Sequence, residues 1–184
     1  YDLGCSTGTT LALLSQAIPD PTVRFVGCDD SDPMLEKCRQ KLVAGGCSDR
    51  CDLMKCDLNE EIPIENASVV VINYTLQFVR PLHRDRLIRT IYNGLRERGC
   101  LIISETILAE QSLLNSLYIG LYYELKKRNG YSEREIVQKR EALENVLIPY
   151  KINENLELLQ RNGFRSQDVF FRWYNFASFI AIKL

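Results

Sequence analysis

The chain has 184 residues, of which 46% are hydrophobic and 26% are charged, and 23 Lys and Arg against 24 Asp and Glu give a net charge of −1. This composition is typical of a globular protein and predicts a single domain over residues 1–184. It argues against a free-standing nucleic-acid-binding protein, which normally carries a basic face, and no apolar run is long enough to span a bilayer.

The seven cysteines are an odd number without a Cys-x-x-Cys pair, and His83 is the single histidine of the sequence. A zinc site is therefore not expected, and we predict no metal. Several cysteines lie in apolar runs, where they are expected to be small core residues. Unpaired cysteines indicate a reducing, cytoplasmic location.

Residues 1–10 predict the end of a strand, a glycine turn and a helix from Thr9 to Ile18. Because the chain opens inside a strand, we expect an N-terminal segment to be missing from this sequence. Gly4 and Gly8 form Gly-x-x-x-Gly, and Ser6 takes the place of the second glycine of the dinucleotide fingerprint. This predicts a nucleoside ligand without a pyrophosphate, such as S-adenosylmethionine. The alternative is that the glycine turn only connects the strand to the helix and binds no ligand.

The second predicted strand, Val23 to Asp29, ends in Asp29 and Asp30. A carboxylate at this tip can accept hydrogen bonds from both hydroxyl groups of a ribose. The alternative is that these two residues only begin the next helix. Asp32-Pro33 predicts the start of that helix, with Asp32 as the capping side chain, and the helix runs to about Val43.

A third strand is predicted from about Cys51 to Cys56, followed by Asp57 and Leu58. Asp57 is a candidate for binding an adenine amino group, or it simply begins a loop. The apolar run Ala67 to Asn73 predicts a strand buried on both faces of a parallel sheet. Asn73 at its end is a candidate for the methionine part of the ligand, or a turn residue.

An amphipathic helix is predicted from Arg84 to Leu95, and its arginines (Arg84, Arg86, Arg89) are expected to form a solvated face. Cys100 to Glu105 predicts a fifth strand. Strands that alternate with helices indicate an α/β fold with a mainly parallel sheet.

Residues 109–149 interrupt this alternation with two helical segments, the second of which begins at a capping box of Ser132 and Glu135. We expect this insert to cover the carboxyl edge of the sheet as a substrate-binding element. By its spacing alone, Arg140 is interpreted as an exposed partner of Glu144.

The tail predicts a helix from Ile152 to Asn162 and an antiparallel hairpin of Gln167–Trp173 and Ser178–Lys183. Its aromatic residues are expected in the core or an interface: Phe170, Phe171, Trp173, Tyr174 and Phe176. Glycine turn, acidic strand tip and hairpin together resemble the Rossmann-like class I S-adenosylmethionine-dependent methyltransferase fold. That fold has a mainly parallel seven-stranded sheet, a C-terminal antiparallel hairpin and helices on both faces.

Five stretches carry a closer resemblance, which extends over essentially the whole chain. They are Asp2-Leu3-Gly4-Cys5-Ser6, Ile64 to Ser68, Asn73-Tyr74-Thr75-Leu76-Gln77-Phe78, Asn129 to Ser132, and Gln138-Lys139-Arg140 through Leu143-Glu144-Asn145-Val146. They are similar to the carboxy-S-adenosyl-L-methionine synthase family. The resemblance implies that S-adenosylmethionine and prephenate give carboxy-S-adenosylmethionine and phenylpyruvate, for modification of the wobble uridine of tRNA.

By position, the resemblance implies that Arg140 binds the new carboxylate, in place of a surface ion pair. The family also has an N-terminal segment with a tyrosine in the cofactor pocket, and no part of this sequence matches that segment. Residues 147–151 also differ from the family pattern. The implied cofactor-binding residues are Gly4, Cys5 and Ser6 at the turn, Asp29 and Asp30 near the ribose, Asp57 and Leu58 near the adenine, Asn73 near the methionine, and Arg140.

The sequence leaves two alternative functions open. One is an S-adenosylmethionine-dependent methyltransferase that acts on a small molecule or on tRNA, and the other is a non-catalytic cofactor-binding subunit. The near-neutral charge argues against direct tRNA contact. The aromatic tail and the helical insert predict a homodimer. We expect no membrane partner.

Overall fold

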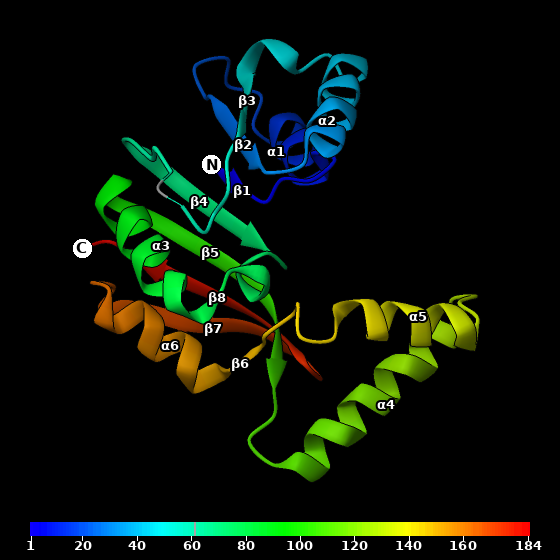
Figure 1. The fold of residues 1–184 in the computed structure, drawn as a ribbon. Coiled ribbons are helices and arrows are strands. Elements are labelled where there is room, and N and C mark those ends of the chain that lie inside the picture. Colours follow the sequence, from blue (N-terminus) through cyan, green and yellow to red (C-terminus); the bar gives the residue numbers. More distant parts are fainter. Residues whose placement is uncertain (61) are drawn as a thin grey trace.

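The computed structural model describes residues 1–60 and 62–184. Over these residues the chain folds around one eight-stranded sheet, seven strands of which lie in the order β3-β2-β1-β4-β5-β8-β7 (Figure 1). The bounds are β1 (Asp2–Leu3), β2 (Phe25–Asp29), β3 (Cys51–Lys55), β4 (Ala67–Asn73), β5 (Leu95–Leu108), β7 (Ser166–Trp173) and β8 (Phe176–Ile182).

Strands β1 to β5 pair in parallel, and β8 pairs antiparallel with both β5 and β7. This confirms the predicted mainly parallel sheet with a C-terminal antiparallel hairpin. The short strand β6 (Tyr150–Lys151), which the sequence did not predict, pairs in parallel with the end of β5. Since β1, β2 and β4 run in the same direction, Gly4, Asp30 and Tyr74, which follow them, lie at one edge of the sheet.

The core lies between the sheet and its helices. Helices α3 (Pro81–Gly94) and α6 (Ile152–Arg161) pack together over the β4, β5 and β7 half of the sheet, while α1 (Thr9–Ala17) and α2 (Asp32–Ala44) lie beside β1, β2 and β3 (Figure 1). Two short 3₁₀ helices, η1 (Ser48–Arg50) and η2 (Leu76–Phe78), complete the connections. The larger buried cluster includes Leu3, Val70, Ile72, Leu87, Ile88, Ile91, Leu101, Ile103, Leu158 and Phe179.

Helices α4 (Ser112–Arg128) and α5 (Glu133–Leu143) form an arm that follows the carboxyl end of β5 and projects from the sheet (Figure 1). We call this pair of helices the arm. The predicted capping box is confirmed: Ser132 Oγ accepts a bond from Glu135 N, and the Glu135 carboxylate accepts one from Ser132 N. No residue of α4 is buried, whereas Ile136 of α5 is, so α4 is the more open of the two helices.

Two predictions about local structure are wrong. The cap of α2 is Ser31 rather than Asp32, and Ser31 donates its backbone N–H to Asp29 Oδ1. Arg84 is not solvated but only 1% exposed, while Arg86 and Arg89 are exposed as expected. The helix begins at Pro81, so Arg84 precedes Leu87 by three residues, and therefore shares the buried face of α3.

The predicted aromatic cluster of the tail is divided between two environments. Phe170 and Phe171 of β7 are more than half exposed. The Trp173, Tyr174 and Phe176 rings contact aromatic rings of α4, with Tyr122 and Phe176 centroids 4.9 Å apart. The end of the hairpin therefore supports the base of the arm.

Candidate functional site

The glycine turn after β1 packs closely against the segment after β4. Gly4 has φ of +80°, and a Cβ atom built on it would lie 2.3 Å from the Oγ1 and Cγ2 atoms of Thr75. Any other residue at this position would meet both backbone strain and a steric clash. Gly4 thus sets how near the turn comes to the end of β4.

The turn is also tied to the end of β2 by hydrogen bonds. Gly4 N and Cys5 N both donate to Cys28 O, at 2.8 and 2.9 Å, and Ser6 N donates to Asp29 Oδ2 at 2.8 Å. The structure therefore brings Gly4, Cys5, Ser6 and Asp29 together. Asp29 Oδ1 accepts a hydrogen bond from Ser31 N. Each carboxylate oxygen of Asp29 has further lone pairs that can accept a bond from a hydroxyl group.

The other predicted polar residues lie near the same edge of the sheet. Asp30 is exposed beside Asp29. Asp57 is also exposed, and its Oδ1 accepts bonds from Asn59 N and Nδ2, which lower the pKa of its carboxyl group. Asn73 Nδ2 donates to Thr10 Oγ1 at 3.3 Å, so it connects the end of β4 to the first turn of α1.

Two of the predicted cofactor residues have buried side chains. Cys5 is 5% exposed, and burial raises the pKa of its thiol. Leu58 is 8% exposed and belongs to the main core cluster. A ligand at this edge would therefore meet mainly the backbone of these two residues.

A buried carboxyl group, which was not predicted from the sequence, holds the segment after β4. Glu105 of β5 is 2% exposed, and its Oε1 accepts bonds from Thr75 N at 3.2 Å and Leu76 N at 2.9 Å. Its Oε2 accepts Gln77 N at 3.0 Å. Burial raises the pKa of Glu105 to about 8, while these three N–H donors act in the opposite direction.

Arg84 binds the other end of the same segment. Its Nε donates to Val79 O at 2.9 Å, and its Nη2 donates to Gln77 O at 3.3 Å and to Ile148 O at 2.7 Å. The guanidinium also lies 4.2 Å from the centre of the Tyr150 ring. Arg84 therefore joins η2 to the segment by which the chain returns from the arm.

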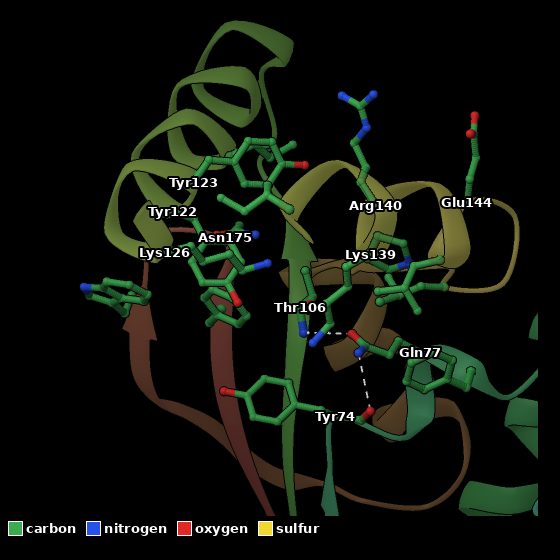
Figure 2. A pocket seen from close by; sticks show the side chains of 18 of the residues that line it. Tyr74, Gln77, Thr106, Tyr122, Tyr123, Lys126, Lys139, Arg140, Glu144 and Asn175 are labelled. Atoms are coloured by element: carbon green, nitrogen blue, oxygen red, sulfur yellow. Dashed lines mark hydrogen bonds between the residues drawn. The ribbon is translucent and has the colours of Figure 1, made fainter. Parts of the chain in front are cut away.

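A cavity of about 1060 Å³ lies between the arm and the hairpin, next to the end of β4. Figure 2 shows Gln77 at its floor, where Oε1 accepts Thr106 N and Nε2 donates to Tyr74 O. Much of its wall is aromatic, and its charged residues come from the arm and from Glu144, which directly follows it. The aromatic residues are Tyr74, Phe78, Tyr122, Tyr123, Phe171, Trp173 and Phe176, and the charged ones are Lys126, Lys139, Arg140 and Glu144.

Arg140 lies on α5 at the outer rim of this cavity. Its side chain is exposed and extends away from Tyr74 and Gln77, as that of Glu144 does (Figure 2). Among the ion pairs of residues 1–60 and 62–184, none joins Arg140 to Glu144. One reason is that α5 ends at Leu143, so Glu144 is already outside the helical repeat.

Three further residues line the cavity but were not predicted from the sequence: Gln77, Lys126 and Lys139. Gln77 belongs to the Asn73–Phe78 stretch, and Lys139 is next to Arg140, so both were near a recognised motif. Lys126 lies on α4, and no sequence pattern links it to α5. Only the packing of the arm places it in the cavity.

Comparisons with known proteins agree with the fold. A family model described as a methyltransferase domain matches residues 1–99. Solved structures of an O-methyltransferase family protein from Burkholderia thailandensis and of an O-methyltransferase family 2 protein from Planctomyces limnophilus superpose with TM-scores of 0.73 and 0.72. They are 14% and 19% identical, and 99% and 100% of this chain matches 49% of each of theirs, so they show the fold alone.

Closer relatives come from curated proteins that carry one name. A carboxy-S-adenosyl-L-methionine synthase of Methylococcus capsulatus is 55% identical over 183 residues, and one of Desulfotalea psychrophila is 47% identical. The matches cover 100% of this chain and 76% and 74% of those proteins. The chain therefore belongs to the carboxy-S-adenosyl-L-methionine synthase family, a family of transferases built on the methyltransferase domain.

Proposed function

We propose that this protein converts S-adenosyl-L-methionine and prephenate into carboxy-S-adenosyl-L-methionine and phenylpyruvate. The observation that carries the proposal is the aromatic, cation-bearing cavity that adjoins the glycine turn through Tyr74 and Thr75. A ring-bearing dicarboxylate suits such a cavity, and the acidic strand tips at the same edge suit the ribose of the cofactor. The names of the relatives support the product.

The proposed reaction balances without a metal or a redox partner. Prephenate loses its ring carboxylate as carbon dioxide and its ring hydroxyl as hydroxide, which leaves the aromatic ring of phenylpyruvate. The hydroxide removes a proton from the sulfonium methyl group and becomes water. The resulting ylide carbon attacks carbon dioxide and forms the new carbon–carboxylate bond. The protein contributes orientation, exclusion of water and stabilisation of charge.

The experiment that tests the proposal is mass spectrometry of the small molecules in the purified protein, before and after addition of S-adenosylmethionine and prephenate. We expect a species that matches synthetic carboxy-S-adenosylmethionine, together with phenylpyruvate. S-Adenosylmethionine or S-adenosylhomocysteine alone, with no carboxylated product after prephenate is added, would contradict the proposal and favour a methyltransferase or a binding subunit.

Arg140 is proposed to bind the carboxylate of the product, because a guanidinium can form two parallel hydrogen bonds to a carboxylate and none to a methyl group. Arg140→Ala should reduce the preference for the carboxylated over the plain cofactor by about 10- to 100-fold, as expected for charge-assisted bonds. Equilibrium binding of both cofactors measures this ratio. Arg134→Ala, an exposed arginine of the same helix, is the control, and an unchanged ratio in Arg140→Ala would refute the role.

The glycine turn gives a second prediction in the same assay. Gly4→Ala should weaken S-adenosylmethionine binding at least about tenfold, because the new methyl group displaces Thr75 and strains the turn. Gly46→Ala is the matched control, since Gly46 also has a positive φ but no atom within 4 Å of the added Cβ. Equal cofactor affinities for the two variants would show that the contact with Thr75 has no role.

The proposed partners are prephenate and a second copy of this chain. Leu113, Leu117 and Leu121 recur every fourth residue on α4 and are 77%, 52% and 39% exposed, which supports a homodimer through the arm. The net charge of −1 supports a small-molecule substrate over direct tRNA contact, so the role in wobble-uridine modification would come from the product. Seven free thiols are consistent with a cytoplasmic site for this reaction. Among the described helices, none has the length and apolarity needed to cross a bilayer.

A further inference from the structure

Two lysines of the arm face the cavity from its opposite helices. Lys126 comes from α4 and Lys139 from α5, and Figure 2 shows Lys126 beside Tyr122 and Lys139 on the side of Arg140. A smaller cavity of about 320 Å³, between the two helices, is lined by the same two lysines. Lys126 and Lys139 therefore lie where the two cavities meet.

These lysines lack a protein anion to compensate them within the described residues. None of the ion pairs there involves Lys126 or Lys139, whereas the neighbouring Lys127 pairs with Glu124 and Glu133. Of the two carboxylates at the cavities, Glu135 is engaged by the cap at Ser132 and Glu144 points outward. The positive charge of the cavity is thus free to bind an external anion.

Lys126 is also held in place. Its ammonium group lies 4.5 Å from the centre of the Tyr122 ring and 5.8 Å from that of Tyr123, and its side chain is half-buried. Burial, followed by the charge of Lys139, lowers the pKa of Lys126. Lys139 itself is exposed, so Lys126 is the cation that is partly removed from water. A half-buried cation beside a second positive charge is stabilised by an anion that binds between the two.

From this arrangement we infer that Lys126 and Lys139 form the binding site for the 2-oxo carboxylate of the substrate, the carboxylate that remains in phenylpyruvate. The inference rests on the proposed function and divides the two carboxylates of prephenate between two sites. The lysine pair binds the retained carboxylate inside the cavity, and Tyr122 and Tyr123 contact the adjoining ring. Arg140 at the rim is left for the carboxylate that is transferred.

The test measures binding of prephenate and phenylpyruvate to the protein saturated with S-adenosylmethionine. In Lys126→Gln and in Lys139→Gln, the dissociation constants of both acids should rise by about tenfold or more, because each variant loses one charge-assisted bond. The affinity for S-adenosylmethionine should be unchanged. Lys127→Gln on the same helix is the control and should bind both acids as the wild type does.

Arg140→Ala provides the contrast, because phenylpyruvate no longer has the transferred carboxylate. It should bind phenylpyruvate normally while the lysine variants do not. If the wild type forms product but both lysine variants keep wild-type affinity for both acids, the lysine site is refuted and the proposed function stands. If the wild type neither binds prephenate nor forms the product, both proposals fail.

Discussion

Replacement of Arg84 by methionine is expected to lower the free energy of unfolding by about 3–5 kcal/mol. The carbonyl oxygens of Gln77, Val79 and Ile148 would lose a charged donor, and the first two of these bonds are buried. Methionine fills a similar volume and cannot donate a hydrogen bond. Urea denaturation of the wild type and the variant measures the difference.

Arg89→Met is the matched control for this experiment. Arg89 is an exposed arginine of the same helix, and its bond to Asn162 is long, at 3.4 Å. Its replacement should change the free energy of unfolding by no more than about 0.5 kcal/mol. A loss below about 1 kcal/mol for Arg84→Met would mean that the buried guanidinium contributes no more than a surface group.

The second large effect is expected at Glu105. In Glu105→Gln, the amide NH₂ group must face at least one of the backbone N–H groups of Thr75, Leu76 and Gln77 that now donate to the two carboxyl oxygens. The amide NH₂ group would then face a backbone N–H group, and at least one hydrogen bond would be lost. This should reduce the free energy of unfolding by about 2–4 kcal/mol. Because Thr75 packs on Gly4, cofactor affinity should fall as well.

The stability difference between wild type and Glu105→Gln should depend on pH in a defined direction. Burial raises the pKa of Glu105 from its ordinary 4.5 to about 8, so between these values the folded state keeps a proton that the unfolded chain has released. The resulting stability is complete below pH 4.5 and declines as the pH rises toward 8. The advantage of wild type over Glu105→Gln should therefore shrink between pH 5 and pH 8. An advantage that stays constant would show that Glu105 remains ionised throughout.

Both residues act on one segment from opposite ends, and this explains how the two halves of the site are connected. Glu105 binds the N–H groups at the start of η2, and Arg84 binds carbonyl oxygens at its end. Thr75, before η2, contacts the glycine turn, while Ile148, bound by Arg84, follows the arm. The glycine turn and the cavity are therefore joined by one hydrogen-bonded segment, which would connect the proposed cofactor and substrate sites.

The sequence by itself predicted those features that depend on neighbouring residues. Strand β4 was predicted from Ala67 to Asn73, with the bounds that the structure has. The glycine turn, the acidic end of β2, the capping box at Ser132 and the closing hairpin were predicted as well. Each of these follows from hydrophobic periodicity or from the side chain that a turn or cap requires. Both signals can be recognised within a stretch of a few residues.

Only the tertiary structure decided which distant residues meet. Arg84 and Ile148 are separated by 64 positions, and Glu105 and Leu76 by 29, so no local pattern reveals either bond. The sequence places Lys126 and Lys139 on different helices, and the packing of the arm alone makes them line one cavity. The physical reason is that burial of a charge and convergence of cations depend on how helices and strands pack, whereas periodicity determines only which elements form.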